Sequence, residues 1–475
     1  MKKLPVPPGD YPCTWLFEGV SVSGELELAG GKMPRGLVFD MPGGWTVTTA
    51  ASGETVSHFS PHTVEVPMLR GRFRTNHNSV LLDAEVSYVF PEQARARAKM
   101  ALCGWEIPNQ DPLLFDSVEF QVSGLTELSG VTAFREMTLP TSDATDRHFS
   151  ATWNSSADQA WQAATGEELS LGYVAHVNFD RSYRYSVSSY PVVTIKGEPR
   201  SAEEWMQGFV RPLAELTTLA TATKQSISWV LLKPPGHDRH DVQVFAADIA
   251  QEPFDAQSPE PRSVGSLVRL GPGGASLADL LAGWRNLQDS YDIFFDYLTV
   301  SLREEMSFKT RFLALVPALE SYHTTKYGDG PVSRADFRRQ RKAVLGRLKA
   351  AEGVQADDIA WLDEWVSTLG SYPLQERLRQ LLHDLPEALQ DRIRSGTDPL
   401  PTCLEGTLER PQDVWHVMGK VRNNLAHGGG TPTWEQLACL TRLAHTMAVG
   451  LALQQLGVPD TALINAIDRG DWTIL

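Results

Sequence analysis

The sequence predicts an α+β protein, with an N-terminal β-rich domain at residues 1–276 and an all-α helical bundle at residues 277–475. Two observations indicate this division. The N-terminal part consists largely of short apolar runs bounded by Gly, Pro, Asn and Asp, which is typical of strands and turns. After Leu277, apolar residues recur at intervals of three and four, the period of an amphipathic helix. We expect the N-terminal domain to be a sandwich or a curled sheet, and mixed rather than purely β, because a helical segment interrupts its strands.

The N-terminal strands are predicted from apolar runs and from alternation. Runs at 37–39, 63–66, 80–89 and 115–122 are bounded by turn-forming residues. In the segment SVSGELELAGG, which begins at Ser21, apolar residues alternate with polar ones before a Gly-Gly turn. We therefore expect many short strands joined by polar turns.

A helix and two further strands are expected before the bundle. Ser201 begins a Ser-x-x-Glu capping box, followed by apolar positions at helical spacing. Residues 226–233 and 241–250 predict strands on either side of a turn-rich segment. The Pro-, Gly- and Ser-rich residues 251–274 predict a loop.

The second half predicts about four or five helices with short connections. Apolar residues recur at helical spacing around Phe312 and around Leu382. A further helix is expected over about 411–426, where the glycines at 428–430 stop it. A Thr-x-x-Gln capping box at Thr433 predicts the start of a last apolar helix.

The composition excludes several classes of protein. The 43 basic and 58 acidic residues give a net charge of −15, so the chain as a whole is not a nonspecific polyanion binder. No apolar stretch approaches the roughly 20 residues that cross a bilayer, and prolines interrupt the N-terminal segment that a secretory signal would need. The four cysteines have no CxxC spacing, which argues against a zinc knuckle and a disulfide framework. We expect a soluble, cytoplasmic protein with no membrane contact.

The stretch VMGKVRNNLAHGGG at 417–430 contains the residues best suited to chemistry. Arg422 offers a planar, permanently charged group for phosphate, and His427 can exchange protons near neutral pH. Helical rotation places them about 140° apart, so they share a face only if the helix loosens before the glycines. The pair is the minimum for metal-free RNA cleavage, in which the 2′-hydroxyl attacks the adjacent phosphorus. The ordinary alternative is that both residues merely complement the C-terminus of a helix.

Arg-Asn-x-x-x-His before a glycine, on the penultimate helix of a bundle, resembles the Arg-x4-6-His motif of the HEPN superfamily of ribonucleases and RNA-associated proteins. The segments RFLALVPALESYH at 311–323 and PLQERLRQLLHDL at 373–385 resemble helices of the ApeA-like HEPN branch. In the first half, GELELAGGKMPRGLVFD at 24–40 and LLFDSVEFQVSGLTEL at 113–128 resemble the ApeA N-terminal domain.

The resemblance implies a bacterial antiphage defence effector: a metal-independent HEPN endoribonuclease without cofactor that cleaves host RNA such as tRNA. It implies that Arg422 holds the scissile phosphate, that His427 assists proton transfer and that Asn423 orients the pair. It also implies a homodimer through the HEPN domain, with one active site built from both chains. The N-terminal module would either sense a phage-derived trigger or position the substrate. The alternative is a non-catalytic HEPN module for RNA binding or dimerisation that serves a partner effector.

Glu320 and His323, three residues apart, are expected to support the Arg-His pair. A metal there is the less favoured alternative, because carboxylate-bridged di-metal bundles need a second Glu-x-x-His, which this bundle lacks. We therefore expect no metal site.

Two pairs of N-terminal histidines, His58 with His62 and His237 with His240, also have ligand-like spacing. They lie in turn-rich sequence without further ligands at zinc spacing, so solvated loops are favoured. A metal-dependent hydrolase that uses them is the remote alternative.

The segment RADFRRQRKAVLGRLK at 334–349 is strongly basic in an acidic chain. A solvated helical face is the ordinary interpretation. The competing hypothesis is an RNA-backbone contact made by Arg338, Arg339, Arg341 and Lys342.

Overall fold

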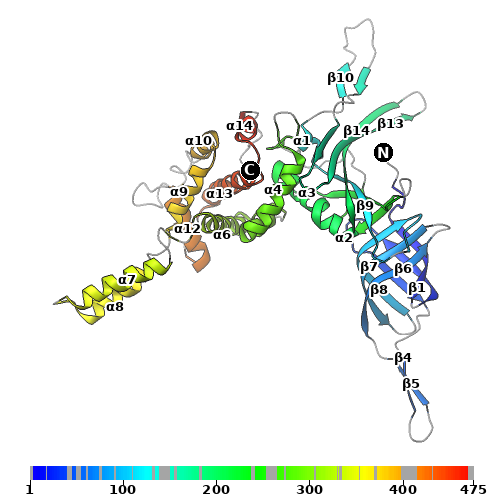
Figure 1. Ribbon diagram of the computed structural model, residues 1–475, viewed down its shortest axis with the longest axis horizontal. Helices are drawn as coiled ribbons and strands as arrows, with labels where there is room; N and C mark the ends of the chain where they lie inside the picture. The colour runs from blue at the N-terminus through cyan, green and yellow to red at the C-terminus, as the bar shows by residue number, and fades with distance from the viewer. Residues whose placement is uncertain are drawn as a thin grey trace. The chain divides into compact units, whose positions relative to one another are not determined.

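The computed structural model of the protein contains two compact units (Figure 1). The first comprises Met1–Ser263, Arg269–Pro272 and Ser276–Ala278, and the second comprises Val264–Val268, Gly273–Ala275 and Asp279–Leu475. The structure describes residues 4–17, 19–39, 45–49, 55–59, 62–73, 77–89, 93–109, 111–130, 134–138, 150–153, 158–180, 184–236, 241–252, 265–271, 274–303, 306–328, 330, 334–351, 353–367, 372–396, 414–429 and 432–468. Most of the loop predicted at 251–274 lies outside these residues.

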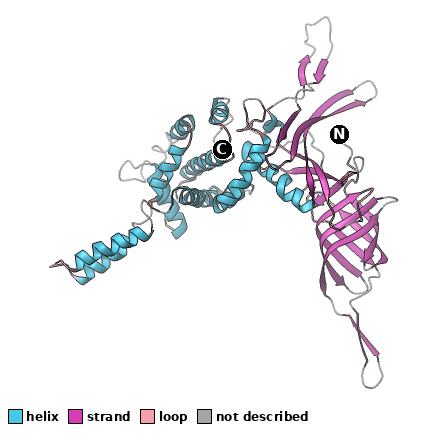
Figure 2. Ribbon diagram, viewed as in Figure 1, coloured by secondary structure: helices cyan, strands magenta, loops and turns pink. Residues whose placement is uncertain are grey.

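Six antiparallel strands of the first unit close into a barrel (Figures 1 and 2). They pair in the order β8-β3-β2-β1-β6-β7, and β7 pairs again with β8. The strands are β1 (Gly9–Phe17), β2 (Val20–Leu28), β3 (Arg35–Phe39), β6 (Thr63–Phe73), β7 (His77–Val89) and β8 (Gln93–Gly104). The alternation in the segment from Ser21 is confirmed, since Val22, Leu26 and Leu28 on β2 are buried.

Trp15 fills the interior of this barrel. Its side chain is fully buried, and its Nε1 donates a hydrogen bond to the carbonyl oxygen of Leu37 at 3.1 Å. Glycines on β2, β3 and β6 make room for the indole: a Cβ on Gly24, Gly36 or Gly71 would lie 2.7, 2.9 or 2.7 Å from its ring atoms. Because contacts this short require movement of the ring or the strand, these glycines are required by the packing.

Strand β8 also belongs to a longer sheet with the order β8-β16-β15-β9-β14-β13-β12. The additional strands are β9 (Phe115–Val122), β12 (Gln159–Gln162), β13 (Glu168–Asp180), β14 (Arg184–Arg200), β15 (Ile227–Lys233) and β16 (Val242–Ala246). Two separate hairpins are formed by β4 (Trp45–Thr49) with β5 (Thr55–Phe59) and by β10 (Phe134–Thr138) with β11 (Ser150–Trp153).

The helices of the first unit include the segment predicted from Ser201. The helical segments are α1 (Leu125–Ser129), α2 (Ala202–Trp205), the π-helical turn η2 (Met206–Val210) and α3 (Arg211–Thr221). The capping box is confirmed, because Ser201 and Glu204 exchange both side-chain to backbone hydrogen bonds. The α+β layout predicted from the sequence is therefore observed.

Ten helices follow in the described residues after Ser276, more than the four or five predicted. They are α4 (Leu277–Ser290), α5 (Asp292–Arg303), α6 (Phe308–Tyr327), α7 (Arg334–Lys349), α8 (Ala356–Ser367), α9 (Leu374–Asp384), α10 (Glu387–Gly396), α12 (Val414–His427), α13 (Trp434–Gln455) and α14 (Asp460–Asp468). Helix α6 packs against α5, α9, α12 and α13, and α7 packs against α8. The capping box predicted at Thr433 is confirmed at the start of α13.

Helix α13 is long and apolar enough, by length and composition, to cross a membrane. This differs from the expectation that no apolar stretch approaches such a length. However, 89% of its apolar window is buried inside the protein, as expected of a helix in the core of a bundle.

The packing around Trp15 predicts that Gly24→Ala destabilises the first unit by about 1–3 kcal/mol or more, because the new methyl group would overlap the indole and the Leu37 carbonyl oxygen. Chemical unfolding followed by tryptophan fluorescence measures the change. The matched control is Gly172→Ala on β13, where a Cβ would make only an ordinary contact with Asp158 at 3.6 Å. Equal stability of the two variants would contradict the proposed packing constraint.

Candidate active site

Helix α12 carries the Arg-His motif and remains regular to its last residue, His427. Gly428 then adopts a left-handed backbone conformation, with φ of 74°, and the Gly429 N–H donates a hydrogen bond to the Asn424 carbonyl oxygen at 2.7 Å. This is the Schellman arrangement that ends many helices at glycine. The helix therefore does not loosen before its end, and Arg422 and His427 stay about 140° apart around its axis.

Arg422 is held by two oxygen atoms from different elements. Its Nη2 lies 3.2 Å from Glu320 Oε2 on α6, and its Nη1 donates to Asn423 Oδ1 at 3.1 Å. The Arg422 side chain is 33% exposed and that of Glu320 is 26% exposed. The guanidinium is thus oriented by its neighbours while part of it remains open to an incoming anion.

His427 lies at the exposed end of α12. No hydrogen bond or ion pair within the described part of the chain engages its ring. An imidazole in this position has both nitrogens available for proton exchange with a ligand.

The structure does not bring His323 to the Arg-His pair. Its side chain is fully buried between α6 and α9, and its Nε2 lies 2.7 Å from Gln380 Oε1. Burial, together with the nearby Arg377 guanidinium, lowers the pKa of His323. Of the two supporting residues predicted from the sequence, only Glu320 therefore contacts Arg422.

The predicted RNA-contact residues on α7 divide into two groups. Arg339 pairs with Asp336 at 2.7 Å, and Arg341 pairs with Asp363 of α8 at 2.6 Å. Arg338 and Lys342 are exposed, and within the described residues no ion pair engages either. Part of the positive charge counted in the sequence is therefore neutralised, by α7 itself at Arg339 and by α8 at Arg341.

The structure adds a pocket that the sequence did not reveal. It has a volume of about 420 Å³, lies between the first turn of α9 and one face of α12, and is lined in part by Asn423. Its walls come from segments some 40 positions apart in the chain, as shown by the His416 and Gln375 side chains that meet across it. No sequence motif marks such a site, because only the packing of α9 against α12 creates it.

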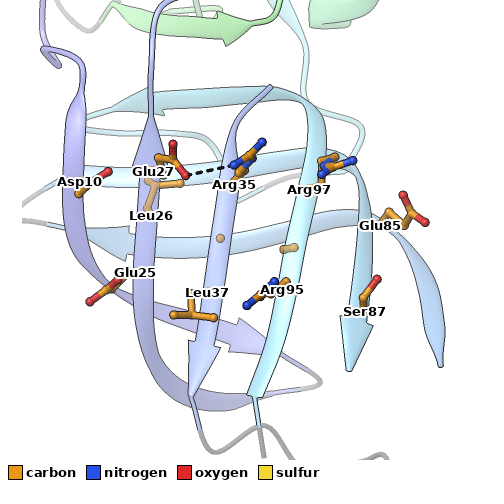
Figure 3. Close-up of a pocket in the computed structure, with 12 residues that line it drawn as sticks. Asp10, Glu25, Leu26, Glu27, Arg35, Leu37, Glu85, Ser87, Arg95 and Arg97 are labelled. Atoms are coloured by element: carbon orange, nitrogen blue, oxygen red, sulfur yellow. Dashed lines mark ion pairs between the residues drawn. The ribbon is translucent and has the colours of Figure 1, made fainter. Parts of the chain in front are cut away.

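A larger hollow, of about 790 Å³, lies on the outer face of the barrel (Figure 3). Its charged side chains form a cross-strand row in which Glu27 is opposite Arg35, Arg35 is opposite Arg97, and Arg97 is opposite Glu85. Glu27 and Arg35 lie 3.9 Å apart and are about half exposed. The row thus places two arginines side by side between two glutamates. Charged side chains at outward-facing strand positions are ordinary on the solvent-facing side of a sheet, so we place the candidate active site elsewhere.

Among the described residues, no group of three or more His, Cys, Asp and Glu side chains is placed to hold a metal ion. His62 stacks on the Tyr88 ring with 4.4 Å between ring centroids, and His237 and His240 lie outside the described residues.

The fold and the geometry together define an α+β protein with a β-rich N-terminal unit and a helical unit that carries a candidate phosphate-binding arginine. Residues 15–271, more than half of the chain, match the family described as ApeA N-terminal domain 1. The chain belongs to this family, which indicates an antiphage defence protein. No curated protein and no solved structure matches the chain. The N-terminal resemblance predicted from segments 24–40 and 113–128 is confirmed, whereas the HEPN assignment of the helical unit stays a prediction.

Two buried histidines of the helical unit predict that its stability decreases in acid. Burial lowers the pKa of His323, and burial together with nearby Arg311 lowers that of His445 on α13 to about 4. The unfolded chain takes up these protons near pH 6.5 and the folded chain only at lower pH, so stability is lost as the pH falls from 6.5 towards 4. The slope is at most about 1.4 kcal/mol per pH unit for each histidine.

Urea unfolding followed by far-UV circular dichroism across this pH range measures the effect. His445→Gln is expected to flatten the dependence, whereas the same change at the exposed His383 leaves it unaltered. An unchanged slope in His445→Gln would show that this histidine is not the titrating group.

Proposed function

We propose that the helical unit is a metal-independent HEPN endoribonuclease and that the protein acts as an antiphage effector. The observation that carries this proposal is the arrangement on α12: Arg422 is oriented by Glu320 and Asn423 but partly open, and His427 is exposed at the end of the same helix. A phosphate-binding cation and a free imidazole are the groups that transesterification of RNA requires.

The proposed reaction forms one P–O bond and breaks another. The ribose 2′-oxygen attacks the adjacent phosphorus and loses its proton, while the 5′-oxygen of the next nucleotide leaves and gains one. Arg422 stabilises the charge on the phosphoryl oxygens, and His427 transfers a proton to or from one of the ribose oxygens. The products are a 2′,3′-cyclic phosphate and a 5′-hydroxyl. DNA lacks the attacking hydroxyl and is not cleaved.

The regular end of α12 supports a site composed of two chains. Since Arg422 and His427 point about 140° apart, one helix presents them poorly to a single phosphate. A two-fold homodimer through the HEPN unit would place Arg422 of one chain opposite the partner's His427. We infer the dimer from this geometry together with the resemblance of the motif.

Structured host RNA such as tRNA in the cytoplasm is the proposed substrate, because its cleavage stops translation. The N-terminal unit is the proposed receiver of a phage-derived trigger. No cofactor is required by the residues at this site, since proton transfer and charge stabilisation are supplied by side chains.

A second candidate function is favoured by the ion pair between Arg422 and Glu320. The Glu320 carboxylate occupies one edge of Arg422, which a purely structural link between α6 and α12 would also do. A non-catalytic HEPN module for RNA binding or dimerisation, serving a partner effector, is therefore the alternative.

The proposed mechanism predicts that the purified full-length protein cleaves transfer RNA in excess EDTA, after addition of phage lysate if it is gated, and leaves 2′,3′-cyclic phosphate ends. Arg422→Ala and His427→Ala should each reduce the rate by about 100-fold or more, because each removes a group that acts in the transition state. His383→Ala, at another exposed histidine, is the matched control and should retain activity.

Mixing the two inactive variants distinguishes a composite site from a site within one chain. A heterodimer of Arg422→Ala and His427→Ala contains one site with both native residues only if the site spans two chains. Partial recovery of activity on mixing supports the composite site. Activity that survives either single substitution would show that these residues are not catalytic, and an inactive native protein that still binds RNA would favour the binding module.

The basic face of α7 predicts a separate effect on RNA affinity. The double substitution Arg338→Glu with Lys342→Glu should weaken RNA binding, and more strongly at low salt, because the two exposed cations lie one helical turn apart and can contact adjacent phosphates. Arg339→Glu, at a position already paired with Asp336, should have a smaller effect. Filter binding over a salt series measures both; equal, unchanged affinities would exclude α7 from the RNA contact.

A further inference from the structure

The pocket between α9 and α12 adjoins the candidate active site through one residue. Asn423 lines the pocket and also accepts the hydrogen bond from Arg422 Nη1. His416, Gly419, Lys420 and Asn423 follow at positions i, i+3, i+4 and i+7, so they lie along a single face of α12. The pocket and Arg422 therefore share one amide side chain.

Gly419 keeps the floor of this pocket open. A Cβ at this position would meet only Leu374 Cδ2, at the ordinary contact distance of 3.8 Å, so packing does not demand a glycine. Glycine within a helix is intrinsically less favourable than alanine. Glycine at this position thus lowers the stability of the helix but leaves the pocket unfilled, whereas a larger side chain would occupy it. An unfilled pocket is what a ligand site requires.

The polar groups around the pocket are mostly hydrogen-bond donors. His416 Nδ1 lies 3.2 Å from Gln375 Oε1, and because an amide oxygen only accepts, Nδ1 is the donor. This leaves the Gln375 amide NH₂, the Asn423 amide NH₂ and the Lys420 ammonium group to donate to a ligand, and the second nitrogen of His416 to accept from one.

The apolar surface of the pocket comes from one residue of α9 and one aromatic residue of α12. Leu374 forms part of the wall, and Trp415, 6% exposed, lies at its base. A volume of about 420 Å³ lined by apolar side chains and a few directional polar groups is within the range of small-ligand sites.

We propose that this pocket binds the nucleobase next to the scissile phosphate, and that it favours bases with carbonyl oxygens over adenine. Lys420 contacts the phosphate of the same nucleotide, while the two side-chain amides donate to the base edge. The proposal rests on the proposed ribonuclease function for its position in the reaction. The side-chain amides of Gln375 and Asn423 thereby select the cleavage site.

Binding and cleavage are measured separately. Equilibrium binding of the four nucleoside 5′-monophosphates and of inorganic phosphate to the full-length protein needs no catalysis. Gly419→Leu fills the pocket and is expected to weaken binding of UMP, GMP and CMP by at least about tenfold, the typical worth of one base contact. AMP is expected to bind the native protein most weakly. The matched control, Gly346→Leu, adds the same side chain to a helical glycine of α7 with no atom within 4 Å and should leave binding unchanged.

In cleavage assays, the native protein should prefer particular bases beside the cut, and Gly419→Leu should reduce that preference while circular dichroism shows an intact helical unit. If nucleotide binding depends on Gly419 but the native protein cleaves no RNA, the pocket stands and the ribonuclease proposal fails. If the protein cleaves RNA with the same base preference in Gly419→Leu, the ribonuclease proposal stands and the pocket assignment is wrong. Affinity for the four nucleotides no greater than for inorganic phosphate would also overturn the assignment, because Lys420 alone would then account for binding.

Discussion

The geometry of the helical unit depends on helix α6. It packs against α5, α9, α12 and α13, and Phe312, Leu319 and Tyr322 on it are fully buried. A close-packed helix with four neighbours cannot shift without loss of contacts on every side. Glu320 therefore has a defined position, and the ion pair it makes sets the direction of Arg422 on α12. Apolar packing, which has no chemical role in itself, thus determines where the candidate catalytic arginine lies.

Helix α12 makes three different sets of contacts along its 14 residues. Its buried side, with Val417 and Met418, packs into the bundle. Arg422 reaches towards α6, while the face that carries Lys420 and Asn423 lines the pocket against α9. Asn423 belongs to both the pocket and the arginine contact, so the proposed sites for phosphate and for the base share one amide.

The N-terminal unit has its own core, built around Trp15 rather than around a catalytic group. Because its six strands close on themselves, the barrel has no open edge. The three glycines that surround the indole make this closure sterically possible. Membership of the ApeA N-terminal domain 1 family rests on this part of the chain. Variants in this core and variants on α12 therefore report on separate units.

Much of this protein is determined by local sequence. Alternation along β2, the capping boxes at Ser201 and Thr433, and the glycine that ends α12 depend on residues a few positions apart, so the α+β layout and the candidate pair Arg422 and His427 could be predicted. Tertiary structure decided what lies beside them. The barrel closure, the pairing of Glu320 with Arg422, the burial of His323 and the α9–α12 pocket all join segments far apart in the chain. Periodicity specifies which side of a helix is apolar, but not which helix it packs against, because many apolar faces are interchangeable until the whole core is assembled.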